Sequence, residues 1–478
     1  MSGSATAEAM LALNRFGMGP RPGSIAAIER DPRGALIAEL ERGPPLLAAA
    51  SALPSSAKAF RTVADANAKR QAKAVLAKKA QEQARQQMAM APAMAEGATP
   101  GEDMAAKAAA EAVPDPGRPI YLQEAKARIE AALTAEIGFT ERLIWFWSNH
   151  FCISADKIQS MSGAYEREAI RPHALGRFTD MLLAVEGHPA MLFYLDNLAS
   201  MGANSVAGLN RSRGLNENLA REILELHTLG VRSGYSQQDI VSFANVLTGW
   251  TLLPPGDNPE HGGEFSFNPR LHEPGPQTVL GKIYADESAE QGRAVLRDLS
   301  VRPETAMHLA TKLARHFVAD QPPPALVERM AKAFLDSTGD LKETAKAMVV
   351  SPEAWQQPAK LRRPGEWVVA MVRAAGITQT DAMRYTAGQA LLGEPLWRPS
   401  SPKGYADDEA TWIDGMGRRL DVANNFAERV AGIADPGNIV ESVLRSQVSP
   451  ATREAIGRAE SRQQALTLLF MSADLQRR

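Results

Sequence analysis

The sequence holds a single cysteine, Cys152, and aromatic residues make up only 6 % of its 478 positions. One cysteine excludes an intrachain disulfide and leaves the redox compartment open. Cys152 lies in the aromatic segment WFWSNHFCIS, where we expect a buried, unreactive thiol rather than a nucleophile. With 45 % apolar residues, and with alanine and leucine abundant, the composition favours helices over sheets.

Neither sign of charge is in excess, because 53 Lys and Arg face 55 Asp and Glu for a net charge of −2. Nucleic-acid binding therefore has no support from the overall charge. No apolar run reaches the roughly 18 residues of a membrane span, so we expect no such span. The segment MSGSATAEAMLALNRFGMG lacks a basic region followed by an apolar one, which predicts a cytoplasmic protein without a secretory leader.

The sequence also lacks the short motifs of several large enzyme classes. It contains no GxxxxGK[ST] loop, no GxSxG elbow, no HExxH pair, no CxxC and no EF-hand loop. No GxGxxG follows a predicted strand and precedes a helix. Phosphoryl transfer on a P-loop and hydride transfer on a dinucleotide-binding fold are therefore disfavoured.

The hydrophobic pattern predicts a mainly α protein, a large bundle-like single domain over residues 1–478. Within it we expect a central lobe at 120–300 and a C-terminal helical lobe at 301–478. Residues 55–119 are rich in Ala, Lys, Gln and Arg, which predicts a peripheral helical, low-complexity insertion. The only expected sheet is a small β-hairpin near 264–281, where residues 264–267 and 278–280 flank a turn-rich segment.

The densest group of chemically capable residues is Asn216–Val231, NENLAREILELHTLGV. A helix turns by about 100° per residue, which gives this segment one aliphatic and one polar face. The polar face and its shoulder hold Glu217, Arg221, Glu225, Thr228, Asn218 and Glu222. His227 lies outside that face, beside Ile223.

The polar face has two interpretations. Glu217, Arg221 and Glu225 are spaced four apart, as in a solvated ion-pair ladder worth a few tenths of a kcal/mol per pair. Alternatively, the face lines a pocket in which Asn218, Glu222 and Glu225 supply the acid/base or ligand side. Arg221 would then orient an anionic group or hold Glu217.

A metal site is the second hypothesis for this region. Helical bundles bind metals through Glu-x-x-His pairs on facing helices, which this helix approaches without matching. A divalent metal would be held by Glu222 and Glu225 with His150 arriving from another helix, or with His272. On its aromatic segment, however, His150 is more typical of a buried, hydrogen-bonded core residue. Asp196 joins the glutamates as a candidate for paired-carboxylate hydrolysis.

The order of nine motifs resembles a bacterial family called domain of unknown function 1800. The motifs are LALNRFGMG, RLIWFWSNHF, HPAMLFYLDN, NENLAREILELHTLGV, DIVSFANVLTGWT, FNPRLHEPGPQTVLG, ARHFVAD, LLGEPLWRPSSPKGY and MSADLQRR. The resemblance covers almost the whole chain apart from 55–119. That family has no settled activity, and its genes often lie beside those of domain of unknown function 1501, which is similar to sulfatases and alkaline phosphatases.

The resemblance implies that the polar helix is functional, in an enzyme-like protein with an acid/base or metal-assisted pocket. The alternative is a non-catalytic partner or accessory subunit of a domain of unknown function 1501 protein. Many relatives carry an export leader, so the alternative compartment is the periplasm, reached by co-export with a partner. The candidate catalytic residues are Glu222, Glu225, Asn218, Arg221, Glu217, Asp196 and His272. The family's signature positions map onto Asn14, Arg15, His150, Asp196, Asn197, Asn216, Glu217, Asn218, Arg221, Glu222, Glu225, His227, Thr228, Trp250 and His272.

Overall fold

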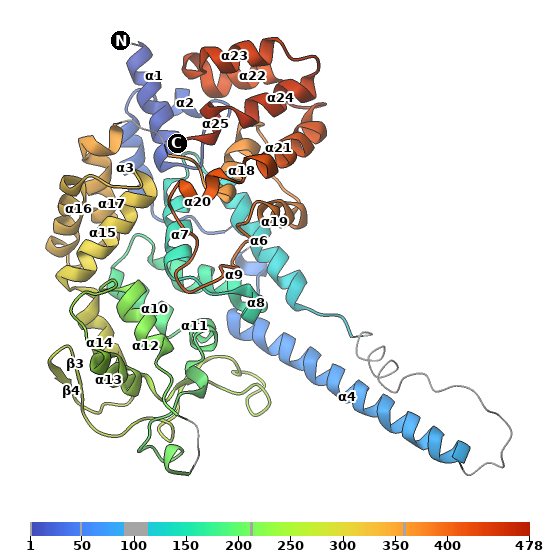
Figure 1. Ribbon diagram of the computed structural model, residues 1–478, viewed down its shortest axis with the longest axis vertical. Coiled ribbons are helices and arrows are strands. Elements are labelled where there is room, and N and C mark those ends of the chain that lie inside the picture. The colour runs from blue at the N-terminus through green and yellow to red at the C-terminus, as the bar shows by residue number, and fades with distance from the viewer. Residues whose placement is uncertain (1, 48–49, 90–112, 211–213, 357–359) are drawn as a thin grey trace.

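A computed structural model describes residues 2–47, 50–89, 113–210, 214–356 and 360–478, and these are mainly helical, as predicted (Figure 1). Labels α and β mark α-helices and strands, and η marks short 3-10 or π-helical turns. Across these residues, no helix combines the length and apolar character that crossing a membrane requires.

Up to His173, all regular secondary structure among the described residues is helical. It comprises α1 (Ser2–Leu11), η1 (Ala12–Phe16), α2 (Ser24–Ile28), α3 (Pro32–Arg42), η2 (Ala50–Ala52), α4 (Ser56–Ala89), α6 (Gly117–Thr134), α7 (Phe139–His150), α8 (Ala155–Ile158), η3 (Gln159–Met161), α9 (Ser162–Tyr165), η4 (Glu166–Ile170) and η5 (Arg171–His173).

The middle part contains every strand found among the described residues. Its elements are α10 (Phe178–Glu186), α11 (Pro189–Tyr194), η6 (Asn197–Ala199), η7 (Gly208–Asn210), α12 (Asn218–Glu222), η8 (Ile223–His227), α13 (Gln237–Leu247), β1 (Trp250–Leu252), β2 (Phe265–Phe267), β3 (Gln277–Val279), β4 (Lys282–Tyr284) and α14 (Ala289–Ser300).

The last part is again helical. It runs through α15 (Pro303–Phe317), α16 (Pro324–Asp336), α17 (Leu341–Val350), η9 (Pro352–Trp355), α18 (Pro364–Ala374), α19 (Ala382–Leu391), α20 (Ala410–Ile413), α21 (Met416–Val430), α22 (Pro436–Ile439), η10 (Val440–Leu444), η11 (Arg445–Gln447), α23 (Pro450–Gly457), α24 (Arg462–Met471) and α25 (Ala473–Gln476).

The small β region differs from the predicted hairpin. The two predicted strands form, but β2 pairs with β1 and β3 pairs with β4, each pair antiparallel. Leu280 and Gly281, between β3 and β4, both have positive φ, which matches the twist of a two-residue hairpin turn. The prediction that 264–267 pairs with 278–280 was wrong. Strand β1 begins three residues after the end of α13, where no strand was expected, and it is β1 that pairs with 265–267.

Helix α4 is the long exposed helix predicted for the insertion, and Figure 1 shows it projecting away from the body. Its first turns touch the body, where Phe60 packs on Phe193 and the Arg61 guanidinium donates to the Gly262 carbonyl at 2.8 Å. Farther out, Leu76 is 65 % exposed. The rest of the predicted insertion falls largely on residues 90–112, which lie outside the described residues.

The two ends of the chain meet over the middle of the body. An isolated antiparallel bridge joins Leu361 to Arg477, and α18 packs on both α25 and α6. Helix α7, almost wholly buried, lies beneath them and also contacts α3. The predicted division at 300/301 into a central and a C-terminal lobe stays a prediction.

A buried arginine closes the C-terminal end of α6. Arg373 on α18 donates to the carbonyls of Ala132 and Ala135, each at 2.8 Å, and to that of Gly19 at 2.8 Å. The last carbonyls of a helix have no partner within the helix, and a cation there also complements the helix dipole. Burial lowers the pKa of Arg373 to about 9, and the neighbouring Arg21 adds to this.

Replacing this guanidinium tests its role. Arg373→Leu leaves several buried carbonyls without donors, and each costs about 1–3 kcal/mol, so we expect at least about 3 kcal/mol of lost stability in urea unfolding. The control is Arg384→Leu, which removes an exposed guanidinium that is paired with Asp381 and should change stability by less than about 0.5 kcal/mol. Equal effects of the two substitutions would contradict this assignment.

Candidate functional site

The signature segment is not one regular helix. Helix α12 ends at Glu222 and continues as the π-helical turn η8, and Thr228 then leaves the helical region with φ −127° and ψ −94°. The prediction of one regular helix over 216–231 was therefore wrong beyond Ile223. A π-turn rotates by less than the 100° per residue that was used to place the side chains. Such turns are rare and occur often at functional sites. Gly230, with φ 90°, ends the segment by donating to the Leu224 carbonyl.

The polar face of this segment is an ion-pair ladder at the surface. Arg221 lies 2.7 Å from a Glu217 oxygen and 3.6 Å from a Glu225 oxygen, with the three side chains between 26 and 35 % exposed. Glu217 and Arg221 border an open depression of about 620 Å³ that also includes Asn218. The geometry is that of the solvated ladder, so catalysis by Glu217, Arg221 or Glu225 stays a prediction.

The other predicted catalytic residues lie in separate surroundings. The Asp196 carboxylate accepts from Lys157 at 2.6 Å at the surface, while its backbone carbonyl accepts from Asn216. Buried His272 donates from Nδ1 to the Thr248 carbonyl at 2.8 Å, and its Nε2 lies 3.6 Å from Asp286. Across the described ranges no three His, Cys, Asp or Glu side chains are grouped to hold a metal ion, so His150, Glu222 and Glu225 form no such set there.

Three histidines surround the end of η8, and we call them, with Glu186, the histidine cluster. The Nε2 groups of His150 and His308 donate to the free carbonyls of His227 at 3.1 Å and Leu226 at 3.0 Å. His227 itself donates from Nδ1 to a Glu186 oxygen at 2.8 Å, with both side chains at most 1 % exposed. The His150 ring centroid lies 6.1 Å from that of His227 and 6.2 Å from that of His308.

These hydrogen bonds fix the tautomers of the histidines in the cluster and leave some of their ring nitrogens without a hydrogen-bond partner. With its proton on Nδ1, His227 keeps a lone pair on Nε2, and among the described residues this atom has no hydrogen-bond partner. His150 Nδ1 and Glu186 Oε2 are likewise buried and unpartnered there. A carboxylate that holds an imidazole in one tautomer, with the second nitrogen free, is an arrangement suited to general-base chemistry.

The groups around the cluster have shifted pKa values. Burial lowers the pKa of His308 to about 4 and, helped by Lys312, that of His150 well below its usual range. Burial also lowers the pKa of Lys312 to about 8. Glu222, half-buried at the edge, has its pKa raised by desolvation and by Glu225, against the opposing effect of His227. Perturbed groups gathered in this way are typical of functional sites, although structural networks also produce them.

Cys152 fits the expected buried thiol. Its Sγ contacts the carbonyl oxygens of Ser401 at 3.5 Å and Pro402 at 3.2 Å. Burial raises the pKa of the thiol to about 12, so almost no nucleophilic thiolate exists at neutral pH.

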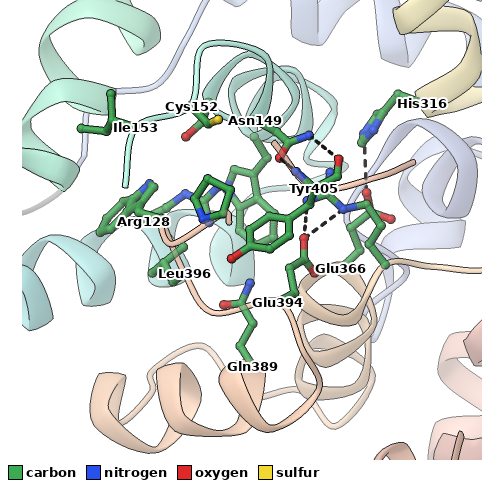
Figure 2. Close-up of a pocket in the computed structure, with 15 residues that line it drawn as sticks. Arg128, Asn149, Cys152, Ile153, His316, Glu366, Gln389, Glu394, Leu396 and Tyr405 are labelled. Atoms are coloured by element: carbon green, nitrogen blue, oxygen red, sulfur yellow. Dashed lines mark hydrogen bonds and ion pairs between the residues drawn. The ribbon is translucent and has the colours of Figure 1, made fainter. Parts of the chain in front are cut away.

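A second polar centre lies between α7 and the segment LLGEPLWRPSSPKGY, around a small enclosed cavity (Figure 2). Asn149 clamps this segment, because its amide both donates to the Tyr405 carbonyl at 2.9 Å and accepts from the Tyr405 N–H at 2.8 Å. Glu366 and Glu394 face the cavity with Arg363. The cavity measures about 50 Å³, and a water needs roughly 10–15 Å³ on this measure, so it holds a few waters rather than a substrate.

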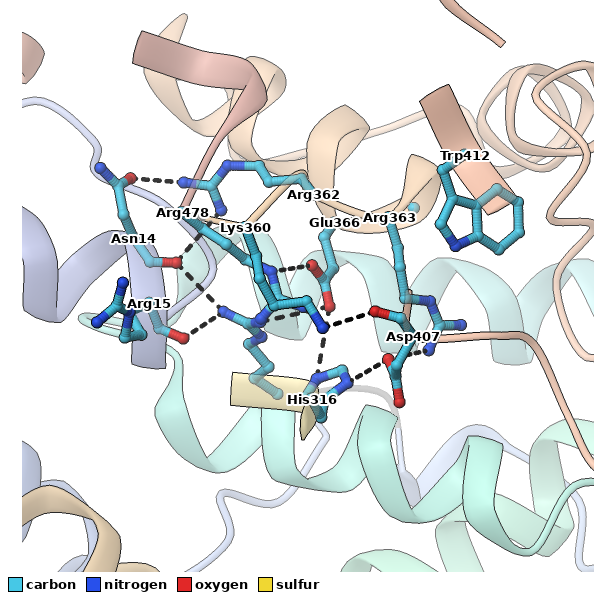
Figure 3. Close-up of polar contacts among 12 residues, drawn as sticks. Asn14, Arg15, His316, Lys360, Arg362, Arg363, Glu366, Asp407, Trp412 and Arg478 are labelled. Atoms are coloured by element: carbon cyan, nitrogen blue, oxygen red, sulfur yellow. Dashed lines mark hydrogen bonds and ion pairs between the residues drawn. The ribbon is translucent and has the colours of Figure 1, made fainter. Parts of the chain in front are cut away.

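Beside this cavity runs a buried charge network (Figure 3). His316 donates from Nδ1 to Asp407 at 2.7 Å, and Glu366 lies 3.0 Å from Arg478 and 3.5 Å from Arg142. Although burial alone would raise it, the pKa of Asp407 is held well below its usual range by His316, Arg363 and Lys360. Buried cations outnumber buried carboxylates here; Lys360 also pairs with the partly exposed Asp320 at 2.9 Å, and backbone carbonyls accept hydrogen bonds from the buried guanidinium groups. The buried cations are Arg142, Lys360, Arg362, Arg363 and Arg478, and the carboxylates are Glu366, Glu394 and Asp407.

Sequence reasoning missed Glu186, His308 and Lys312 and set His227 aside. A signal for Glu186 was present, because it follows Phe178, Met181, Leu182 and Val185 at the spacing of a buried helix face, where an apolar residue is expected. His308 and Lys312 lie four apart on α15 beside its core leucines, and nothing in their spacing distinguishes them from surface residues.

A family model described as "Protein of unknown function (DUF1800)" matches residues 11–477. The chain belongs to this family. No curated protein and no solved structure matches it. The family assignment confirms the resemblance read from the nine motifs, and it carries no activity with it.

The buried histidines predict a loss of stability in acid. An imidazole with pKa about 6.5 in the unfolded chain and about 4 for folded His308 binds fewer protons when folded, so stability falls as the pH drops from about 6.5 toward 4. His150 acts in the same direction, whereas Glu39 and Glu124, with raised pKa values, act in the opposite one.

We expect urea unfolding to give a free energy at pH 5 lower by about 1–2 kcal/mol for His308 alone than at pH 7.5. His308→Gln keeps an N–H donor for the Leu226 carbonyl without titrating, so it should show a smaller loss. A variant with the same pH dependence as the wild type would contradict the assignment to His308.

Proposed function

We propose that this protein is an acid–base enzyme in which His227, held by Glu186, is the general base. The observation that carries the proposal is the buried Glu186–His227 hydrogen bond, together with the unpartnered Nε2 of His227. Glu186 selects the Nδ1–H tautomer and stabilises the imidazolium that forms when Nε2 takes a proton. A carboxylate–imidazole pair of this kind typically contributes a factor of about 10²–10⁴ to a rate.

Glu222 is the group that connects this pair with the solvent. Its side chain is partly exposed, and its pKa is raised by desolvation, which brings the carboxyl closer to neutral pH, where a proton-transfer group works best. His150 and His308 tie down the carbonyls at the end of η8 and so fix the backbone that carries His227. The Glu217–Arg221–Glu225 ladder lies outside this set, and its residues Glu217 and Arg221 line the open depression.

The test is a panel of chromogenic carboxylic, phosphate and sulfate esters and glycosides, assayed with the wild type and His227→Gln. We expect turnover of at least one class by the wild type and a loss of about 10²-fold or more in the variant, since the general base is removed. His272→Gln is the matched control, another buried imidazole that donates from Nδ1 and that the sequence had marked as catalytic.

Melting curves establish that both variants are folded. A wild type inactive on the whole panel would contradict the proposal, and so would a His227→Gln variant that keeps its turnover. A loss confined to His272→Gln would move the chemistry to the loop that carries His272.

A second proposal is that the chain is an accessory subunit of a sulfatase- or phosphatase-like protein of domain of unknown function 1501. The projecting helix α4 supports it, because the apolar side chains of Val75 and Leu76 near its middle are 53 and 65 % exposed.

Co-expression and affinity purification of the two proteins test this second proposal. We expect a complex at micromolar concentration that is lost when residues 71–112 are replaced by a short Gly-Ser linker. The closure is feasible because the Arg70 guanidinium already donates to the Val113 carbonyl at 3.2 Å. A complex that survives the deletion would contradict a role for α4, and no complex at all would contradict the proposal.

A further inference from the structure

A cavity of about 550 Å³ lies where the two ends of the chain meet, away from the histidine cluster. It is bordered by α1, η1, α3, η9, η10 and α25, so the motifs LALNRFGMG and MSADLQRR both line it. Its size falls within the range of small-molecule sites, about 300–1,000 Å³. Apolar side chains form part of its wall, and the polar lining residues are Glu8, Asn14, Arg33, Gln447, Asp474, Arg477 and Arg478.

Arg33 presents a pre-positioned guanidinium to this cavity. Its Nε donates to Glu8 at 2.8 Å, and its guanidinium carbon lies 4.5 Å from the ring centroid of Trp355. These two contacts fix the plane of the group, yet Nη1 and Nη2 have no partner among the described residues. A planar pair of free N–H groups held by stacking matches the two oxygens of a carboxylate.

Asn14 supplies a second set of donors. Its side-chain oxygen accepts from Arg362 at 2.5 Å, and its backbone carbonyl accepts from Arg142 at 3.2 Å. Figure 3 shows the consequence, with the amide oxygen turned to Arg362 and the amide nitrogen turned the other way. That nitrogen has no partner within the described part of the chain, and Arg362 prevents the amide from flipping.

The electrostatic surroundings favour an anion. Directly behind Asn14 lie the buried guanidinium groups of Arg142, Arg362 and Arg478, with Glu366 as the carboxylate that contacts two of them. Arg478 is 2 % exposed, and its Nη1 and Nη2 have no hydrogen-bond partner among the described residues. This excess of buried positive charge gives the floor of the cavity a positive potential.

We propose that this cavity binds a small organic carboxylate. The Nη1 and Nη2 groups of Arg33 donate to the carboxylate, the amide nitrogen of Asn14 adds a further bond, and Met10, Leu11 and Leu444 contact the hydrocarbon part. A phosphate dianion fits less well, because Glu8 and Asp474 also line the cavity and would repel a second negative charge.

Titration calorimetry at pH 7.5 with benzoate and its neutral isostere benzamide tests the proposal. We expect benzoate to bind with a dissociation constant at least ten-fold lower than benzamide, since only benzoate pairs with a guanidinium. Arg33→Gln should weaken benzoate at least ten-fold. The matched control is Arg293→Gln, which removes an arginine that is likewise paired with a glutamate at 2.8 Å and placed over a tryptophan, but lines none of the cavities described.

Benzoate binding that is absent, that equals benzamide binding, or that survives Arg33→Gln would overturn the proposal. An equal loss in Arg293→Gln would do so as well, because it would show a general effect of charge. His227→Gln should leave benzoate binding unchanged, so failure of this site and failure of the histidine cluster as a catalytic centre remain distinguishable.

Discussion

The structure depends on buried guanidinium groups that donate to backbone carbonyls. Arg142 holds the carbonyls of Asn14, Arg15 and Gly17, and Arg373 holds those at the end of α6. A buried carbonyl left without a donor costs about 1–3 kcal/mol. Because arginine stays charged when buried and carries five donors, it can satisfy several carbonyls from different segments at once. The N-terminal segment, α6, α7 and α18 are thereby fixed to one another in a way that apolar packing alone does not specify.

The same arginines link the two ends of the chain to the polar centres. Glu366 lies between Arg142, His316 and Arg478, so a charge added or removed at one of them changes the electrostatic environment of the others. Asn14, which lines the cavity, is held in one orientation by Arg362, and this turns its amide nitrogen away from Arg362. The network that joins the packed segments therefore also orients an amide that lines the proposed carboxylate site.

Much of the fold follows from sequence pattern, because helix periodicity and capping are local. The mainly helical fold and the helical part of the insertion form as predicted, and the capping box of Ser236 and Asp239 is a local signal of the same kind. The pairing of β1 with β2 could not be predicted, since both strands are three residues long and their partners are set by tertiary packing. The π-turn that begins at Ile223 could not be predicted either. It changes the rotation per residue, and no residue type in the segment is specific for such a turn. The candidate site depended on that turn and on Glu186, His308 and Lys312, which arrive from segments that no spacing rule connects.

Helix α4 has a mechanical consequence. Its 34 residues span about 50 Å at about 1.5 Å per residue, and Arg61 and Arg70, which donate to carbonyls outside the helix, both lie in its first half. Its projecting turns depend largely on intrinsic helix propensity, which the eleven alanines of the helix supply. Such a helix frays from its tip inward while the body stays folded, so hydrogen exchange along α4 should form a gradient instead of a single cooperative step. The projecting part of α4 is therefore expected to unfold separately from the body. Because the helix lengthens the molecule, rotational diffusion and sedimentation should depend on its length as well as on the mass of the protein.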